Sequence, residues 1–316
     1  MPNIPSEELV EKIIKDLTSD EIISINRFST GKAHYVYDVK TSTDEVVVRL
    51  TRIEQKSSFE SALYWYKILK PLGIPLPTFR LGDMEGSKCG FPLIVMDRLP
   101  GKDLLHAYQE MSSQEKEQLA KEIVDIQKKV GSLKPGSGFG YAMSYEDPKL
   151  HSSWRGVLDL YLERITTRNA KTGLIDKKYI QRLEQLYQSM NEYIQQVKPT
   201  PFLDDTTTKN VIINNGKLSG IVDVDSVCFG DPLLTLALTQ MALTELGDDT
   251  LYTDYWMKLL NLSADQKKAL KMYQGMFALE FASSMGHIFN QETAEAIDHK
   301  ALNHLTTTFE QLTKEL

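Results

Sequence analysis

Residues 205–223 read DTTTKNVIINNGKLSGIVD. Two apolar runs flank the pair Asn215-Gly216, and this arrangement is the strongest short-range signal for a β-hairpin. The sequence therefore predicts a hairpin with Asn215-Gly216 as its two-residue loop. In that register Val211 faces Gly220.

The same register brings polar side chains to the open mouth of the hairpin. Asn210 faces Ile221, and Asp223 lies two residues further on, about 7 Å along the strand at roughly 3.3 Å per residue. Asp205 lies on the loop that enters the hairpin. Two carboxylates and a carboxamide in one place predict a magnesium and phosphoryl-transfer site. The alternative is that these are ordinary loop residues, because an Asp and an Asn at this spacing also occur by chance.

The composition is that of an ordinary globular protein. The chain has 316 residues, 41% hydrophobic and 25% charged, enough for one large domain or two modest ones. The start shows no secretory signal, and no run of about 18 apolar residues predicts a membrane span. The only cysteines are Cys89 and Cys228, and the histidines form no zinc-binding pattern. We expect a cytoplasmic protein with no membrane partner.

The acidic residues are unevenly distributed. The net charge is -7, of which residues 1–100 carry -1 and the remainder -6. This disfavours nucleic acid as the main partner, because phosphate backbones select basic surfaces. It favours a cationic or neutral small substrate on the second part. The alternative is that the excess acids form an ordinary solvated surface.

Hydrophobic periodicity predicts a β-rich first part and a helical second part. We expect helices at 6–17 and 59–69, strands at 22–25, 35–39, 46–50 and 91–96, and a Pro- and Gly-punctuated linker at 97–101. Beyond it we expect helices that begin at the capping box 112–115, at 154–165, 178–197 and 264–289, and from 233 onward, interrupted by the hairpin. The order predicts an α+β fold with two lobes, at residues 1–98 and 99–316. The cleft between lobes is the default place for a ligand.

This order resembles the protein-kinase-like fold. Residues 202–238, FLDDTTTKNVIINNGKLSGIVDVDSVCFGDPLLTLAL, are similar to a pattern of the aminoglycoside phosphotransferase and choline kinase superfamily. That pattern is H-G-D-x4-N, a hairpin, I-I-D-W/F, G-D-P and a D-L-A-like tail. The strand at 46–50 resembles the one with the nucleotide-binding basic residue, and 94–101 resembles the hinge. Gly138–Gly140 and Trp154 resemble a landmark near the start of the helical lobe.

The resemblance implies a role for each candidate residue, and these roles are physically reasonable. It implies Asp205 as catalytic base and Asn210 and Asp223 as Mg²⁺ ligands. It implies that Arg49 contacts the nucleotide phosphates with Glu60 as its partner, and that the turn from Ser29 through Gly31 to His34 covers those phosphates. The Asp97 carbonyl and the Leu99 amide would face the purine edge.

Some of these residues have simpler interpretations. Arg49 is alternatively a surface strand residue, and Glu60 a solvated helix residue. Asp225 and Asp231 are candidates for turn caps. Capping is favoured for Asp231, because Gly230-Asp231-Pro232 is typical of a turn.

The sequence also departs from the family pattern. Leu203 stands in place of the His of H-G-D, and Asp204 in place of its Gly. Gln127 lies where the family has a histidine on the first long helix, and Thr235 replaces the Asp of D-L-A. These departures indicate a divergent branch, either with its own substrate or with nucleotide binding and no turnover.

The resemblance implies a kinase that transfers the γ-phosphoryl group of ATP or GTP, with Mg²⁺, to the hydroxyl of a small molecule. The acidic second part leans toward a cationic acceptor. A second hypothesis is a pseudokinase-like module that binds nucleotide without phosphoryl transfer. A third, a helical scaffold without a ligand, leaves the converging Asp and Asn residues unexplained.

Overall fold

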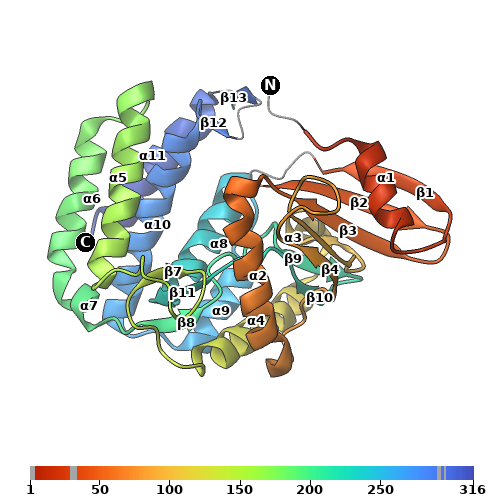
Figure 1. The fold of residues 1–316 in the computed structure, drawn as a ribbon. Coiled ribbons are helices and arrows are strands. Elements are labelled where there is room, and N and C mark those ends of the chain that lie inside the picture. The colour runs from red at the N-terminus through yellow and green to blue at the C-terminus, as the bar shows by residue number, and fades with distance from the viewer. Residues whose placement is uncertain (1–3, 29–33, 290–292, 295–296) are drawn as a thin grey trace.

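The computed structural model describes residues 4–28, 34–289, 293–294 and 297–316 (Figure 1). The first part of the chain forms a five-stranded antiparallel sheet with the order β1-β2-β3-β5-β4. The elements of this part are α1 (Glu7–Lys15), β1 (Ile22–Arg27), β2 (Tyr35–Thr41), β3 (Glu45–Leu50), α2 (Lys56–Leu69), β4 (Phe79–Asp83) and β5 (Leu93–Asp97). Helices dominate the chain after β5, so the predicted α+β fold with a β-rich first part is confirmed.

Helix α1 covers one face of this sheet. Its N-cap is Ser6, whose hydroxyl accepts a hydrogen bond from the amide of Leu9. The buried face of α1 packs against alternate residues of the strands, among them Val39 and Val48. Successive side chains of a strand point to opposite faces of the sheet, so the other face is available to α2.

Strand β4 was not predicted from the sequence. It pairs with β5 through an irregular register that shifts between Phe79 and Leu81. The strand is short, lies at the sheet edge and contains Arg80 and Gly82, so it lacks a β-branched alternating pattern. The prolines before it indicated only a break in the chain.

Helix α2 packs against both parts of the molecule. Phe59 and Ala62 lie in a cluster with residues of β5, whereas Trp65 and Leu69 belong to the large helical core. The indole Nε1 of Trp65 donates to the carbonyl of Ala142 at 2.7 Å. Helix α2 is therefore fixed to the helical part.

The helical part contains the remaining elements. They are β6 (Lys102–Asp103), α3 (Leu104–Ala107), α4 (Ser113–Gly131), β7 (Gly140–Ala142), α5 (Trp154–Thr172), α6 (Lys177–Ser189), α7 (Asn191–Gln196), β8 (Thr200–Phe202), β9 (Val211–Asn214), β10 (Lys217–Ile221), β11 (Val227–Gly230), α8 (Leu233–Leu246), α9 (Leu251–Leu260), α10 (Ala264–Ser284), β12 (Ile288–Phe289), β13 (Thr293–Ala294) and α11 (His299–Thr313).

The helix predictions hold in outline and fail at some boundaries. The capping box of Ser112 and Glu115 opens α4 as expected. The predicted helix at 178–197 is two helices, because the backbone leaves the helical conformation at Met190. The helix predicted to reach 289 ends at Ser284, where Met285 turns to an extended conformation.

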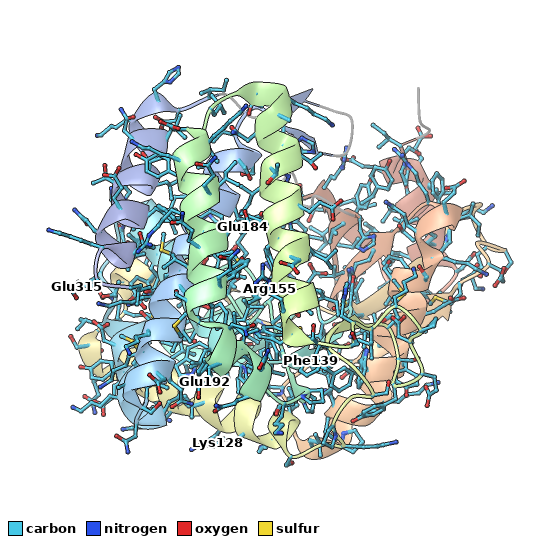
Figure 2. All side chains as sticks on the ribbon, turned by 90° about the vertical axis from the view of Figure 1, so that its left-hand side faces the viewer. Lys128, Phe139, Arg155, Glu184, Glu192 and Glu315 are labelled. Carbon is cyan, nitrogen blue, oxygen red and sulfur yellow. The ribbon has the colours of Figure 1, made fainter. Side chains whose placement is uncertain are left out.

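Helices α5 and α6 lie side by side on the outer side of the helical part. Figure 2 faces this side and labels Arg155 and Glu184. The guanidinium carbon of Arg155 lies 5.2 Å from the ring centre of Tyr187 on α6. None of the helices in the described part of the chain combines the length and apolar character needed to cross a bilayer.

The predicted hairpin is confirmed, but its register is not. Asn215 and Gly216 form the loop with φ of 50° and 72°, as a two-residue hairpin loop requires. Beyond Leu218 a bulge shifts the pairing by one residue, so Val211 faces Ile221 and not Gly220.

The bulge follows from a neighbouring segment. The amide of Ile221 donates to the carbonyl of Pro75 at 2.8 Å. A side chain at Gly220 would bring its Cβ within 2.3 Å of the same carbonyl oxygen. The strand therefore bends at this glycine to reach the segment before β4, a contact that hairpin patterning does not encode.

Candidate active site

The loop between β8 and β9 holds Asp205 in a tight turn. The hydroxyl of Thr207 donates to Asp205 Oδ1 at 2.8 Å. The side-chain amide of Asn210 donates to the backbone carbonyl of Asp205 at 3.0 Å. The predicted catalytic residue and the predicted metal ligand are thus tied to each other inside one turn.

The bulge moves Asp223 closer to Asn210 than the predicted register did. The amide of Val222 donates to the carbonyl of Asn210 at 2.9 Å, so Asp223 lies one residue beyond the paired position and not two. Asp223 has φ of 62°, a left-handed conformation that is uncommon for a residue other than glycine. Such strain is concentrated at functional sites, where the surrounding structure maintains it.

Asp205 and Asp223 line one cavity. Its volume is about 200 Å³, and it is bounded by the loop between β8 and β9 and by the segment after β10. The cavity-lining residues are Leu203, Asp204, Asp205, Thr206, Ile221, Asp223, Val224, Asp225 and Ser226. The structure therefore brings together the two carboxylates that lie 18 positions apart in the sequence.

The carboxylates at this cavity repel one another. Burial, followed by the charge of Asp205, raises the pKa of Asp204 to about 7. Burial also raises the pKa of Asp205, and the charge of Asp223 adds to this effect. Asp205 is exposed toward the cavity, so a bound cation or ligand would change its surroundings. A cation placed among these groups would relieve the repulsion.

The donor set fits Mg²⁺. Within the described residues, no three His, Cys, Asp or Glu side chains lie close enough together to enclose a metal ion on their own. Mg²⁺ typically takes one or two protein carboxylates and completes its shell with water and substrate phosphates. The carboxylate of Asp223 and the amide oxygen of Asn210 match that requirement.

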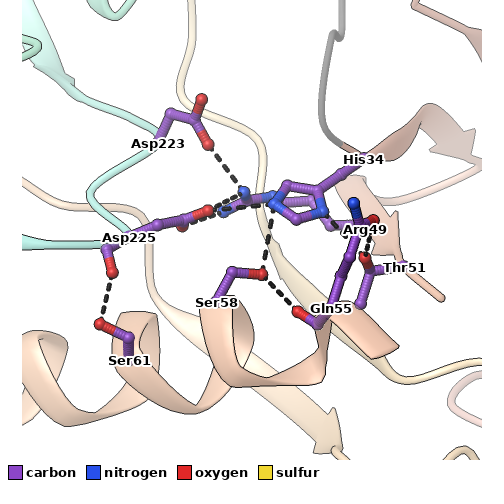
Figure 3. Close-up of polar contacts among 8 residues, drawn as sticks. All are labelled: His34, Arg49, Thr51, Gln55, Ser58, Ser61, Asp223 and Asp225. Carbon is purple, nitrogen blue, oxygen red and sulfur yellow. Dashed lines mark hydrogen bonds and ion pairs between the residues drawn. The ribbon is translucent and has the colours of Figure 1, made fainter. Parts of the chain in front are cut away.

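Arg49 is buried and crosses from the sheet to the segment after β10 (Figure 3). Its guanidinium donates to both oxygens of Asp225 and, at 2.7 Å, to Asp223 Oδ1. Burial alone lowers the pKa of Arg49, but the carboxylates of Asp225 and Asp223 outweigh it and raise the pKa. Burial is the largest single effect on the pKa of Asp225 and raises it. The charge of Arg49 and the hydrogen bonds with His34 and Arg49 together outweigh burial, so the pKa of Asp225 lies below its ordinary value.

The expected ion pair between Arg49 and Glu60 is wrong. Glu60 is exposed, and its carboxylate lies 3.7 Å from the ammonium of Lys56, one turn earlier on α2. Helix α2 presents the ring of Phe59 to the guanidinium, whose carbon lies 5.2 Å from the ring centre. The helical repeat places neighbouring residues 59 and 60 on different faces, so only one of them can face Arg49.

The hinge residues lie at the end of β5. The amide of Asp97 donates to the carbonyl of Thr78 at 2.9 Å, and its side chain binds Arg80. The carbonyl of Leu99 accepts from the guanidinium of Arg98 at 3.0 Å. Their role toward a purine stays a prediction. Ser29 and Gly31, predicted for the phosphate-covering turn, lie outside the described residues.

The sequence predicts no site role for one residue of the site and only a general one for another. Asp225 was considered only as a turn cap, although its position two residues after Asp223 was a usable signal. His34 was placed only at the end of the predicted turn, and its Nε2 lies 3.2 Å from Asp225 Oδ2. The cap predicted for Asp231 is confirmed, since its Oδ1 accepts from the amide of Leu233 at 3.1 Å.

The residues that depart from the family pattern contact one another's backbone at Leu203 and Asp204, in the loop between β8 and β9. Gln127 of α4 and Thr235 of α8 both bind the backbone of Leu203. Thr235 also donates to the carbonyl of Asp204. The loop is therefore anchored from two helices through its backbone.

The fold matches several solved structures along almost its whole length. Aminoglycoside phosphotransferase APH(4)-Ia superimposes with a TM-score of 0.67 at 12% identity, covering 98% of this chain and 99% of that one. ADP-bound APH(2'')-Ib gives 0.66 at 16% identity, with coverages of 98% and 99%. The streptomycin–ATP ternary complex of APH(2'')-IIa gives 0.64 at 16% identity, with coverages of 98% and 97%.

The sequence comparisons agree with the fold. No sequence among the curated proteins matches this chain. The model of the phosphotransferase enzyme family matches residues 24–268, a span that contains β2 to β5, the loop between β8 and β9, and the hairpin. The chain belongs to the phosphotransferase enzyme family.

Proposed function

We propose that the protein is a small-molecule kinase that transfers the γ-phosphoryl group of ATP or GTP to a substrate hydroxyl. The observation that supports this best is the cavity lined by Asp205 and Asp223, with Asn210 tied into the same turn. Residues 1–98 would form the nucleotide-binding lobe and residues 99–316 the lobe that supplies the catalytic loop.

Asp205 would accept the proton of the acceptor hydroxyl or orient that hydroxyl for in-line attack. Its raised pKa suits a base, because a carboxylate with a higher pKa binds a proton more tightly. The hydroxyl of Thr207 fixes one carboxylate oxygen, so the other would face the acceptor.

Asn210 and Asp223 would hold Mg²⁺, which when bound offsets the charge on the nucleotide phosphate oxygens. Arg49 lies beside Asp223 and would contact the same phosphates as a fork-shaped donor. The relatives support a nucleotide as co-substrate, since one solved structure is an ADP complex and another an ATP complex with streptomycin. The acceptor would be a hydroxyl-bearing small molecule, and the acidic helical part favours a cationic one.

The proposal is tested by thermal unfolding with Mg²⁺ and either ATP or GTP, followed by a phosphate-transfer screen over hydroxylated amines, sugars and antibiotics. A ligand at 100 times its Kd raises the unfolding free energy by about 2.7 kcal/mol, so a clear rise in Tm is expected. If neither nucleotide raises Tm, the proposal fails.

A pseudokinase-like binding module is the second candidate, favoured by Leu203 in place of the family histidine. It predicts a nucleotide-dependent rise in Tm but no phosphoryl transfer to any compound of the screen. It also predicts that Asp205→Ala leaves the protein's function intact, whereas the kinase proposal predicts loss of transfer.

A further inference from the structure

We infer that Asp225 is the residue that positions Arg49 in the nucleotide site, in the role expected of Glu60, and that it limits Arg49 to a single contact with the proposed metal ligand Asp223. This inference rests on the proposed function of the site. It is carried by the contacts among His34, Arg49, Asp223 and Asp225, which Figure 3 shows.

Arg49 makes two unequal contacts with carboxylates. Toward Asp225 it is bidentate, with Nη1 donating to Oδ1 at 2.9 Å and Nη2 donating to Oδ2 at 2.7 Å. Toward Asp223 only Nη2 donates, to Oδ1 at 2.7 Å. Paired forks of this kind fix orientation as well as distance, which a single contact does not.

Burial also separates the two contacts. The side chains of Arg49 and Asp225 are 7% and 21% exposed, whereas that of Asp223 is 51% exposed. An exposed ion pair contributes little and exchanges readily, while removing one partner of a buried pair has a large cost. The Asp225 contact is therefore the persistent one, and the Asp223 contact is the one a cation can replace.

Asp225 is itself held from two other elements. The hydroxyl of Ser61 on α2 donates to the carbonyl of Asp225 at 2.5 Å. Nε2 of His34 lies 3.2 Å from Asp225 Oδ2, and Nδ1 of the same ring lies 3.1 Å from the hydroxyl of Thr51. Asp225 thus joins α2, the start of β2 and the basic residue of β3.

The environment of α2 explains why a carboxylate from another segment takes this role. Phe59 occupies the face of α2 that lies against Arg49, and the ring of His34 packs on Phe59 with centres 4.8 Å apart. Glu60 points away and pairs with Lys56. A cation over an aromatic face is attracted, but the face does not fix its donors as a carboxylate does.

This arrangement gives a specific consequence for magnesium. Without the carboxylate of Asp225, the remaining charged partner shown for the Arg49 guanidinium is Asp223. Arg49 would then compete with Mg²⁺ for Asp223, because both are cations that need the same oxygens. Loss of Asp225 should therefore raise the Mg²⁺ concentration needed for nucleotide binding.

The experiment is a titration of nucleotide affinity against Mg²⁺ concentration, by calorimetry, for the wild-type chain, Asp225→Asn, Asp225→Glu and the matched control Glu60→Gln. Each amide variant removes one negative charge with little change in shape. We expect Asp225→Asn to need about tenfold more Mg²⁺ for half-maximal binding, since it breaks a buried charge pair. Glu60→Gln should stay within about twofold of wild type, because its own pair is exposed.

Thermal unfolding shows whether Asp225→Asn is folded. Asp225→Glu is the second test variant, because it keeps the negative charge. Its Mg²⁺ requirement for half-maximal nucleotide binding should lie close to that of the wild-type chain. An unchanged Mg²⁺ requirement in folded Asp225→Asn, or an equal change in Glu60→Gln, overturns the inference. So does an Asp225→Glu variant that folds but behaves like Asp225→Asn. If the wild-type chain itself binds no nucleotide, the proposed function fails first, and the inference falls with it.

Discussion

Gln127 binds both backbone groups of Leu203. Its side-chain oxygen accepts from the Leu203 amide at 3.1 Å, and its side-chain nitrogen donates to the Leu203 carbonyl at 2.8 Å. The same nitrogen donates to the hydroxyl of Thr206 at 3.0 Å, and Thr235 adds a bond to the Leu203 carbonyl at 2.8 Å. Two departures from the family pattern, Gln127 and Thr235, therefore both bind the third, Leu203, and together they hold the loop between β8 and β9.

Replacing Gln127 by Ala should loosen the catalytic loop. The Leu203 carbonyl would keep its bond from Thr235, but the buried Leu203 amide would lose its partner, at a cost of about 1–3 kcal/mol. We expect a lower Tm and a kcat reduced by about tenfold or more, with the nucleotide KM little changed, since positioning losses appear mainly in kcat. The control is Gln118→Ala, an exposed position on the same helix. Equal effects of the two substitutions would contradict this account of the loop.

Asp204 should make stability depend on pH. Its pKa in the folded chain is about 7, against an ordinary value of 3.8, because of burial and the charge of Asp205. The folded state therefore binds this proton more tightly than the unfolded chain, and the stability contributed by Asp204 is lost as pH rises from about 4 to about 7.

Asp204→Asn removes that loss. Its Tm relative to wild type should be higher at pH 8 than at pH 4.5, measured by calorimetry at both values. Asp125→Asn, at an exposed position of α4, is the control for the loss of one carboxylate. A Tm difference for Asp204→Asn that is independent of pH would argue against a raised pKa at this position.

Thr207 should lower the pKa of Asp205, the proposed base. Burial raises the pKa of Asp205, and the hydrogen bond from Thr207 opposes this by stabilising the carboxylate. Thr207→Val should therefore raise the pKa further, so that the acidic limb of the kcat profile moves to higher pH, since the base must be deprotonated. Asp205→Asn should lower kcat by about 10²–10⁴-fold at all pH values. A Thr207→Val profile that coincides with wild type would remove Asp205 from the role of base.

Gly101, between β5 and β6, should be required for the pairing of β6 with β9. Its φ is 108°, and a Cβ there would lie 2.1 Å from the carbonyl oxygen of Ile213 on β9. Gly101→Ala should therefore prevent β6 from pairing with β9. Gly173→Ala is the matched control, because Gly173 also has a positive φ of 66° but nothing lies within 4 Å of its Cβ position.

For Gly173→Ala we expect a loss of about 1 kcal/mol in the free energy of unfolding, from backbone strain alone. Gly101→Ala should lose several times more, because the clash adds to the strain. Chemical denaturation measures both. Similar losses in the free energy of unfolding would show that β9 shifts to make room for the extra methyl group.

The sequence predicted those parts of the site that depend on local patterns. The Asn215-Gly216 loop, the hairpin and the meeting of Asp205, Asn210 and Asp223 follow from alternation and turn chemistry over a short stretch. The capping box likewise placed Ser112 at the start of α4.

The errors arise where a distant segment decides the structure. The register of the hairpin shifts because Pro75 accepts a hydrogen bond from β10. Glu60 was paired with Arg49 from family resemblance, but which face of α2 meets the sheet is set by packing of Phe59 and Trp65. The contact between Asp225 and Arg49 cannot be predicted from local sequence patterns, because the two residues lie 176 positions apart in the chain.

The central claim is that Asp205, Asn210 and Asp223 form one magnesium-dependent phosphoryl-transfer site, and Asp223→Ala tests it most directly. Calorimetric titration with ATP and GTP, with Mg²⁺ and with a chelator, should show wild-type affinity that falls about tenfold or more when the metal is removed. Asp223→Ala should bind weakly in both conditions and show no gain from Mg²⁺. Asp223→Ala that retains the full Mg²⁺-dependent affinity of the wild-type chain would contradict the account.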